Sequence, residues 1–334
     1  MMLKKISKQR RDYIAMWFEV RNDIGISDTM NIGPMEKNTG SVSWHHFPHA
    51  VMDGVGGVSS ILREQGYPCK ELPKGRDLEE PGFFKLLFKP NRNKDTHPKN
   101  IKWKNNYPSG NDNSAPISTC YFDVQTTQKI KRNARLNKVA LSSFALWALN
   151  KSISKNLLQE SQNYYWFYPV NLRGAVSTDT DTGNFSSGVN VCVHNHIKPR
   201  TLQLSIRQKL QSKEYWMTWK LAHIGKYIGK TGIKYLYQSM SAKNFYAGSF
   251  SFLGAWPLVD DVNPPQDPQQ VWVSCGIGTK NYPVSTGIME WHGQLSLGLK
   301  LHPWIADNVD ISHKCLADWQ YYLLQEVNNN DSVE

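Results

Sequence analysis

The sequence contains few cysteines, and none of them is placed for a metal centre or a disulfide framework. Five cysteines occur in 334 residues, far apart and without a Cys-x-x-Cys pair. This argues against a zinc ribbon and a thioredoxin-type site, and it favours a reducing, cytoplasmic compartment. The sequence also lacks a long uncharged apolar run, and its basic start leads into no apolar segment. We therefore expect neither a membrane-spanning helix nor a secretory signal.

Two common phosphate-binding patterns are also missing. There is no Gly-x-x-x-x-Gly-Lys-[Ser/Thr] loop and no Gly-x-Gly-x-x-Gly following a predicted strand. His194 and His196 lie on one face of a predicted strand, but no third ligand follows at a fixed spacing. We therefore expect no metal site.

Positive charge is in excess, with a formal net charge of +11 at pH 7. Such a balance favours an anionic partner, either nucleic acid, an anionic membrane surface or a phosphate-rich cosubstrate. The lysines and arginines are spread along the chain, so an ordinary solvated basic surface explains the excess equally well. We do not expect nucleic acid as a partner.

The hydrophobic pattern predicts strands mixed with helices, without strict alternation. Helices are predicted at 2–20, from a Gly-rich turn at 53–57 to residue 63, after Asp123, at 141–149, over 201–240 and at 312–327. Strands are predicted at 41–47, 117–122, 163–171, 187–194, 248–254, 270–276, 285–291 and 294–301. Residues 67–115 read as a connector, and Gly293 as a hairpin turn. This order predicts a layered, mixed α/β fold.

The strongest local signal is a histidine followed by an aspartate and a glycine, His49-x-x-x-Asp53-Gly54, where a predicted strand meets a Gly-rich turn. A histidine there can serve as a general base near neutral pH, because its ordinary pKa lies close to 7. Asp53 could orient the ring or anchor the turn by pairing with an arginine. A capping aspartate beside a surface histidine is the other interpretation of the bare pattern.

The segment His49-Ala50-Val51-Met52-Asp53-Gly54 resembles the active-site motif of the coenzyme-A-dependent acyltransferase superfamily. This superfamily includes chloramphenicol acetyltransferase, condensation domains of peptide synthetases, plant BAHD acyltransferases and bacterial wax ester synthase/diacylglycerol acyltransferases. The stretch up to Gly57 looks most like the wax-ester-synthase branch. Pro48 stands where the family's motif often has a first histidine, and the pair His45-His46 lies too early to fill that position.

Two further segments resemble the same superfamily. Arg173 ends a predicted strand, and the resemblance implies that it pairs with Asp53. Gly183-Asn184 is similar to the family's later Gly-Asn and is expected to be a structural motif. A third segment, 248–256, resembles the family's Ser-Asn-x-x-Gly strand, and a hydroxyl there, that of Ser249 or Ser251, would stabilise an oxyanion. Ser251 is the candidate for this role. The expected catalytic residues are therefore His49, Asp53, Arg173 and Ser251, and Gly54 belongs to the structural motif with Gly183 and Asn184.

The resemblance implies a two-lobed, chloramphenicol-acetyltransferase-like fold of mixed sheets with flanking helices. Only 48 residues precede His49, which is fewer than is usual in the superfamily. This predicts an abbreviated first lobe over 1–105, which carries the motif and the connector. The C-terminal lobe is predicted over 106–334. Completion of the first lobe by a second copy of the chain, in a homo-oligomer, is an open alternative.

The function implied by the resemblance is acyl transfer with His49 as the general base. The donor would be a thioester of coenzyme A or of a carrier protein, and the acceptor a hydroxyl or amine on a small or lipid-like molecule. No cofactor is expected, because the thioester supplies the activation. The alternative is a non-catalytic binding or scaffold member of the same fold.

Two apolar clusters with neighbouring cations indicate peripheral contact with an anionic membrane. One cluster comprises Phe83, Phe84, Leu86, Leu87 and Phe88, and the other comprises Trp17 and Phe18 in the basic N-terminal segment. The competing interpretation is that both clusters pack on the protein core.

Overall fold

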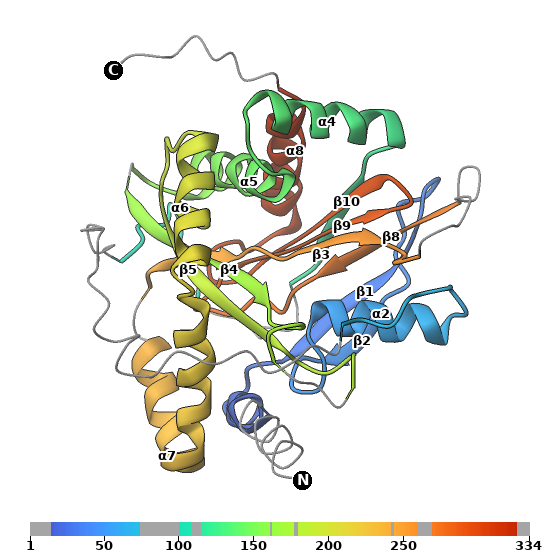
Figure 1. The fold of residues 1–334 in the computed structure, drawn as a ribbon. Coiled ribbons are helices and arrows are strands. Elements are labelled where there is room, and N and C mark those ends of the chain that lie inside the picture. Colours follow the sequence, from blue (N-terminus) through green and yellow to red (C-terminus); the bar gives the residue numbers. More distant parts are fainter. Residues whose placement is uncertain are drawn as a thin grey trace.

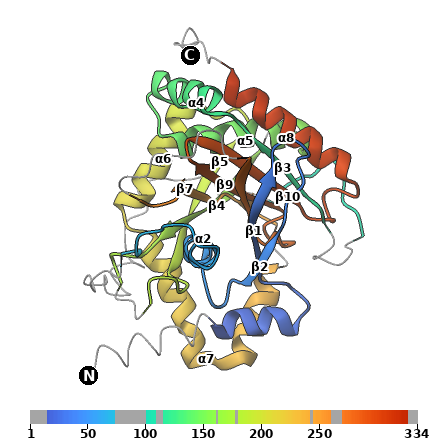
Figure 2. The ribbon, with the colours of Figure 1, turned by 90° about the vertical axis from the view of Figure 1, so that its right-hand side faces the viewer.

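Two β-sheets form the centre of the structure, and helices cover them (Figures 1 and 2). The computed structural model describes residues 15–73, 100–108, 115–160, 162–176, 180–241, 244–259 and 269–325. The helices are α2 (Gly54–Glu64), α4 (Val124–Leu136), α5 (Leu141–Leu157), α6 (Pro199–Gln211), α7 (Tyr215–Ser241) and α8 (Val309–Leu324), preceded by a helical segment at 15–23. The strands are β1 (Thr29–Glu36), β2 (His45–Pro48), β3 (Ile117–Tyr121), β4 (Asn163–Asn171), β5 (Ser186–His194), β6 (Tyr246–Ser249), β7 (Phe252–Trp256), β8 (Gln270–Cys275), β9 (Val284–Trp291) and β10 (Gln294–Leu301). This confirms the predicted α/β fold of mixed sheets with flanking helices.

The larger sheet has the strand order β3-β10-β9-β6-β4-β5, with β7 paired to β9. Its pairs β9–β6 and β6–β4 are parallel, whereas β3–β10, β10–β9 and β4–β5 are antiparallel. Helices α4, α5, α6 and α8 lie on one side of this sheet (Figure 1). Residues 143–150 of α5 are all buried, because the helix packs against both α6 and α8. The β9–β10 hairpin turns at His292-Gly293, both with positive φ, which confirms the turn predicted at Gly293.

The smaller sheet has the order β2-β1-β8 and packs against α2. Strand β8 lies more than two hundred residues after β1 in the chain, yet every residue of β8 pairs with β1. Apolar side chains between this sheet and the helix form a second core, including Ile32, Phe47, Leu62 and Trp272. The lobe boundary at residue 105 stays a prediction.

Strand β1 was not predicted from the sequence. It contains Gly33-Pro34, which is unusual inside a strand because proline lacks the N–H that the ladder uses. Glycine is required at position 33, because a Cβ there would collide with the backbone of Ser43. The strand predicted at 41–47 is shorter than expected, because β2 covers only His45–Pro48.

Two predicted elements are each divided into two. The helical region over 201–240 forms α6 and α7, and α7 is broken at Gly229, whose φ of 62° favours glycine. The strand predicted at 248–254 forms β6 and β7, separated by Phe250 and Ser251. The buried Phe250 side chain occupies the core at this break, and the Ser251 carbonyl accepts from the N–H of Ile288 in β9 at 2.9 Å.

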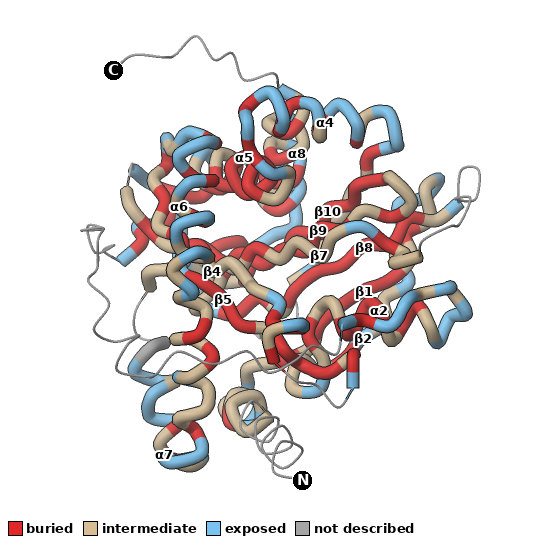
Figure 3. Tube along the Cα trace, viewed as in Figure 1, coloured by how far each residue is buried: buried red, intermediate tan, exposed pale blue. Residues whose placement is uncertain are grey.

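Burial follows the sheets. In Figure 3 the strands of both sheets are mainly buried, while the outer surfaces of α4 and α6 are exposed. Every residue of β10 is buried, because helices cover one of its faces and β8 lies against the other. Across the part of the chain that the structure describes, no helix combines the length and the apolar character needed to cross a membrane.

Candidate active site

His49 lies in the short loop that joins β2 to α2. Its backbone N–H donates to the carbonyl of Asp28 at 2.8 Å, and the N–H of Ala50 donates to the Asp28 carboxylate at 3.2 Å. The loop also closes on itself, since the N–H of Met52 donates to the carbonyl of Pro48 at 3.3 Å. These bonds fix the backbone from which the His49 side chain projects.

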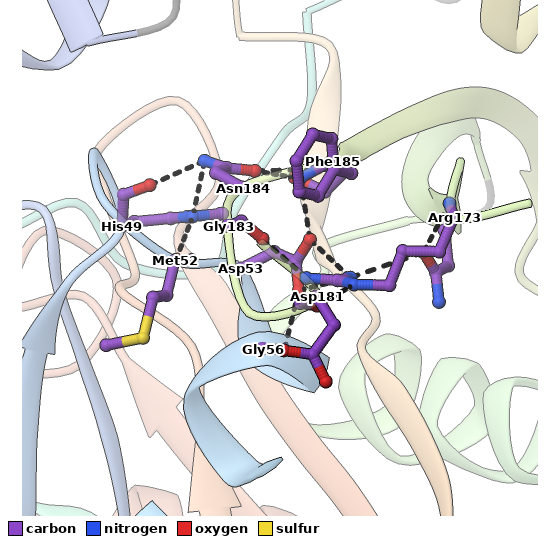
Figure 4. Close-up of polar contacts among 11 residues, drawn as sticks. His49, Met52, Asp53, Gly56, Arg173, Asp181, Gly183, Asn184 and Phe185 are labelled. Carbon is purple, nitrogen blue, oxygen red and sulfur yellow. Dashed lines mark hydrogen bonds and ion pairs between the residues drawn. The ribbon is translucent and has the colours of Figure 1, made fainter. Parts of the chain in front are cut away.

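The His49 ring turns back on its own loop. Its Nδ1 lies 3.1 Å from the carbonyl oxygen of Met52, and the amide nitrogen of Asn184 donates to the His49 carbonyl and lies 3.0 Å from the same Nδ1 (Figure 4). The Met52 carbonyl can only accept and the Asn184 amide nitrogen can only donate, so Nδ1 can hydrogen-bond just one of them in either neutral tautomer. We assign the proton to Nδ1, which then donates to Met52, while the Asn184 amide donates to the His49 carbonyl. Nε2 is then the unprotonated nitrogen, with a lone pair able to take a proton.

The surroundings of His49 keep it neutral. Burial is the largest influence and lowers the pKa of His49 below 6.5, because the imidazolium form loses hydration. The negative charge of Asp53 opposes this change, and the positive charge of Arg21 adds to it. The ring is therefore uncharged at pH 7, the form that a general base requires.

Asp53 is fully committed to structural contacts. It is the N-cap of α2, where its Oδ1 accepts from the N–H of Gly56 at 2.9 Å, and its Oδ2 accepts from the N–H of Phe185 at 2.8 Å. Both oxygens also accept from Arg173. Within the described residues no hydrogen bond joins this carboxylate to the imidazole, so Asp53 anchors the turn, the second of its two predicted roles.

Arg173 contacts Asp53 as the resemblance implied. Its Nη1 reaches the two carboxylate oxygens at 2.8 and 2.7 Å, and the two side chains are 1% and 5% exposed. Its Nε donates to the carbonyl of Asp181 at 2.7 Å, and its Nη2 donates to the carbonyl of Gly183 (Figure 4). The guanidinium thus ties the 181–185 loop to the start of α2, and it makes one-nitrogen contact with the carboxylate rather than a two-nitrogen fork.

A second ion pair holds the same loop. Arg63, near the end of α2, donates to the carboxylate of Asp181 at 2.7 Å, and the N–H of Leu72 donates to the same oxygen at 2.8 Å. Helix α2 approaches the loop closely, since a Cβ on Gly56 would collide with the Thr182 carbonyl. Nothing in the sequence around Asp181 indicates Arg63 as its partner, because the two residues are 118 positions apart.

Asn184 contacts the candidate base directly. Its Oδ1 accepts from the hydroxyl of Ser186 at 2.8 Å and from the Ser186 N–H at 3.2 Å. These bonds orient the amide so that its NH₂ group faces His49. Sequence reasoning had assigned Asn184 and Gly183 to a structural motif. The structure brings Asn184 against His49, whereas Gly183 contributes only its carbonyl to Arg173.

A cavity of about 360 Å³ lies beside His49. Its walls come from the 15–23 helix, the β2–α2 loop, β4, β5, α7 and the β6–β7 region. Gly54 and Asn184 line it together with His49, and apolar groups such as Phe167, Trp219 and Leu253 supply much of the remaining surface. A concave, mainly apolar space with a few polar groups is typical of a small-molecule site.

Ser251 and Ser249 both line this cavity. Their positions follow from the break between β6 and β7, where the N–H of Ser251 donates to the Thr286 hydroxyl at 3.3 Å. The Thr286 hydroxyl in turn donates to the carbonyl of Ser249 at 3.3 Å. The structure therefore brings both predicted serines to the same cavity as His49, and both remain candidates for an oxyanion contact.

The 15–23 helix supplies aromatic side chains that sequence reasoning did not connect with the site. The ring of Phe18 lies 5.0 Å from the His49 ring, and the indole N–H of Trp17 donates to the carbonyl of Ala222 in α7 at 2.7 Å. Both residues line the cavity, which favours packing over membrane contact for this cluster. The other predicted cluster, residues 83–88, lies outside the described residues.

The sequence matches no protein-family profile and no curated protein. Solved structures do share the fold. The first condensation domain of the CDA synthetase is similar with a TM-score of 0.50 and 8% identity, over 92% of this chain and 70% of that one. The condensation domain of the Monacolin K polyketide synthase MokA gives 0.49 and 11%, over 85% and 68%.

The trichothecene 15-O-acetyltransferase TRI3 from Fusarium sporotrichioides gives a TM-score of 0.47 and 9% identity. The match covers 68% of this chain and 49% of that enzyme. At such identities the likeness concerns the fold, which is that of condensation domains.

Proposed function

We propose that the protein is an acyltransferase that moves an acyl group from a thioester to a hydroxyl or amine acceptor, with His49 as general base. The observation that carries this proposal is the state of His49. Its Nδ1 is engaged by the Met52 carbonyl, its pKa is lowered by burial, and it lines a cavity of a size suited to a small molecule. The condensation-domain fold supports the same chemistry.

In the proposed reaction, Nε2 of His49 removes the proton from the acceptor as its oxygen or nitrogen attacks the thioester carbonyl. The resulting tetrahedral intermediate carries its negative charge on the former carbonyl oxygen. When it collapses, the carbon–sulfur bond breaks, and the imidazolium returns its proton to the departing thiolate. The products are an ester or amide and a free thiol. The thioester supplies the activation, so the chain's own groups need only move one proton and stabilise one oxyanion.

Ser251 is the proposed donor to that oxyanion. A hydroxyl rotates freely and can donate to a charge that develops only in the transition state. Asp53 and Arg173 act at a distance, because they hold the loop that carries Asn184 against the His49 backbone. We propose that the donor is a thioester of coenzyme A or of a carrier protein, and that the acceptor is a small or lipid-like molecule. Peripheral membrane contact through the 83–88 segment is also part of this proposal.

A donor and acceptor screen tests the function. The purified chain is incubated with acyl-coenzyme A of several chain lengths and with pools of hydroxyl and amine compounds, and the products are identified by mass spectrometry. Acceptor-dependent release of thiol, with the matching ester or amide, is the expected result. Binding of thioesters without any acceptor-dependent product would instead favour the alternative, a non-catalytic binding member of the same fold.

A further inference from the structure

Arg21 is a charged residue in the cavity wall. Among the residues that the structure describes, no carboxylate forms an ion pair with it. It belongs to the 15–23 helix and lines the cavity together with His49. Its Nη2 makes one hydrogen bond, to the carbonyl of Ser27 at 3.2 Å, and its Nε is buried without a hydrogen-bond partner. A guanidinium has five N–H donors, so most of the donor capacity of Arg21 remains unused within the described structure.

The other arginines near the site are arranged differently. Arg173 is bonded to Asp53 and to two carbonyls, and Arg63 is bonded to Asp181. The two acids on the 15–23 helix face a different cation, since Glu19 pairs with Lys230 and the charge of Asp23 also acts on Lys230. A little further along the chain, the carboxylate of Asp28 accepts from Ala50 and from the side chain of Asn22.

Phe18 lies between Arg21 and His49, and the charge of Arg21 acts on the His49 ring. Its guanidinium carbon lies 5.1 Å from the centre of the Phe18 ring, and that ring lies 5.0 Å from the His49 ring. Burial lowers the pKa of His49, and the charge of Arg21 lowers it further. Burial raises the pKa of Tyr282 in another part of the cavity wall, and the charge of Arg21 opposes that rise. One cation therefore acts on two sides of the cavity.

We propose that Arg21 binds a carboxylate of the acceptor, so that the acceptor is a small hydroxy or amino acid with an apolar body. This inference rests on the proposed acyl transfer and names its substrate class. The apolar lining suits the body of such a molecule, and the unused guanidinium N–H groups suit its carboxylate. The carboxylate would also offset the positive charge that acts on His49.

The negatively charged group that Arg21 binds belongs to the acceptor and not to the thioester donor. In coenzyme A the phosphates are separated from the thioester sulfur by the whole pantetheine arm. A thioester whose carbonyl is within reach of His49 therefore holds its phosphates far from a cation in the wall of the same cavity. The acceptor's nucleophile, in contrast, must contact His49 directly, and a carboxylate on a small acceptor lies close to it.

Ligand binding tests this without requiring turnover. The probes are acids and their neutral amides, namely 3-phenyllactate with 3-phenyllactamide, mandelate with mandelamide, and 4-hydroxybenzoate with 4-hydroxybenzamide. Affinities are measured by ligand-observed NMR for the wild type, for Arg21→Gln and for Arg207→Gln, which changes an exposed arginine on α6 away from the cavity. A wild type that binds an acid about tenfold or more tightly than its amide is the expected result, with the difference lost in Arg21→Gln and kept in Arg207→Gln.

The contrary outcomes are distinct. The inference is wrong if no acid is bound in preference to its amide, or if the preference survives in Arg21→Gln. It is also wrong if Arg21→Gln weakens the binding of coenzyme A and leaves the acids unaffected, which would assign the cation to the donor. This test measures binding, so a preference for acids over amides that depends on Arg21 supports the inference even if the donor screen yields no acyl transfer. If no such preference is found, this inference fails, but the proposed acyl transfer could still use other acceptors.

Discussion

A single nitrogen of Arg173 reaches both carboxylate oxygens of Asp53, at 2.8 and 2.7 Å, across 120 positions of sequence. The pair is almost completely buried, and within the described residues the other hydrogen bonds of the two side chains lead to the 181–185 loop, the start of α2 or the end of β4. The pair therefore controls how the loop that carries Asn184 closes on His49. Its hydrogen bonds assign it a positioning role in the proposed mechanism.

Replacing Asp53 by asparagine should destabilise the protein strongly. Asparagine keeps the size of the side chain but leaves the buried guanidinium of Arg173 without a counter-charge. We expect a loss of about 3–5 kcal/mol in the free energy of unfolding, measured by urea denaturation. The control is Glu160→Gln, which removes an exposed ion pair with Lys102 and should leave stability close to that of the wild type. Equal effects of the two changes would show that the buried pair contributes no special stability.

The sequence predicted this pair but not most of what surrounds it. The motif around Asp53 and the strand end at Arg173 carried enough resemblance to a known family to predict their contact. The contact of Phe18 with His49 and that of Arg63 with Asp181 depend on how distant segments fold together. No local pattern encodes such contacts. Strand β1 could not be predicted for the same reason. Its Gly33-Pro34 is unfavourable in a strand, and the strand is stabilised by pairing with β8, which is distant in the sequence.

The rate of acyl transfer should rise with pH through the pKa of His49. The neutral ring is the active form, and burial holds the pKa of His49 below 6.5. Lowering the pH through that pKa protonates Nε2 and removes the base. We therefore expect kcat/KM to be on its plateau at pH 7 and to fall only on the acid side of 6.5. A rate that is still rising steeply between pH 7 and 8 would contradict this assignment.

Replacing Asn184 by aspartate should move that pH profile. The new carboxylate would lie beside Nδ1 of His49, where Asn184 now places an amide nitrogen at 3.0 Å. A negative charge there favours the imidazolium, so the acid limb of kcat/KM should shift to higher pH. The matched variant Asn184→Ala removes the same contact without adding charge and should lower kcat without that shift. Identical profiles for the two variants would mean that Asn184 does not act on the ring.

Replacing Ser251 by alanine tests the oxyanion contact. If its hydroxyl donates to the tetrahedral intermediate, kcat should fall by about 100-fold while KM changes little. Ser249→Ala is the matched control, since both serines line the cavity and differ by two positions in sequence. A large loss of kcat in Ser249→Ala, with Ser251→Ala near wild type, would transfer the role to Ser249.

The role of His49 as general base is the central claim, and one comparison tests it most directly. Turnover of a thioester with an accepted acceptor is measured for the wild type, for His49→Ala and for His313→Ala, which changes an exposed histidine on α8. Circular dichroism and thermal unfolding establish that both variants are folded. We expect His49→Ala to lower kcat by on the order of a hundredfold or more and His313→Ala to leave it unchanged. A folded His49→Ala variant that turns over like the wild type would contradict the mechanism.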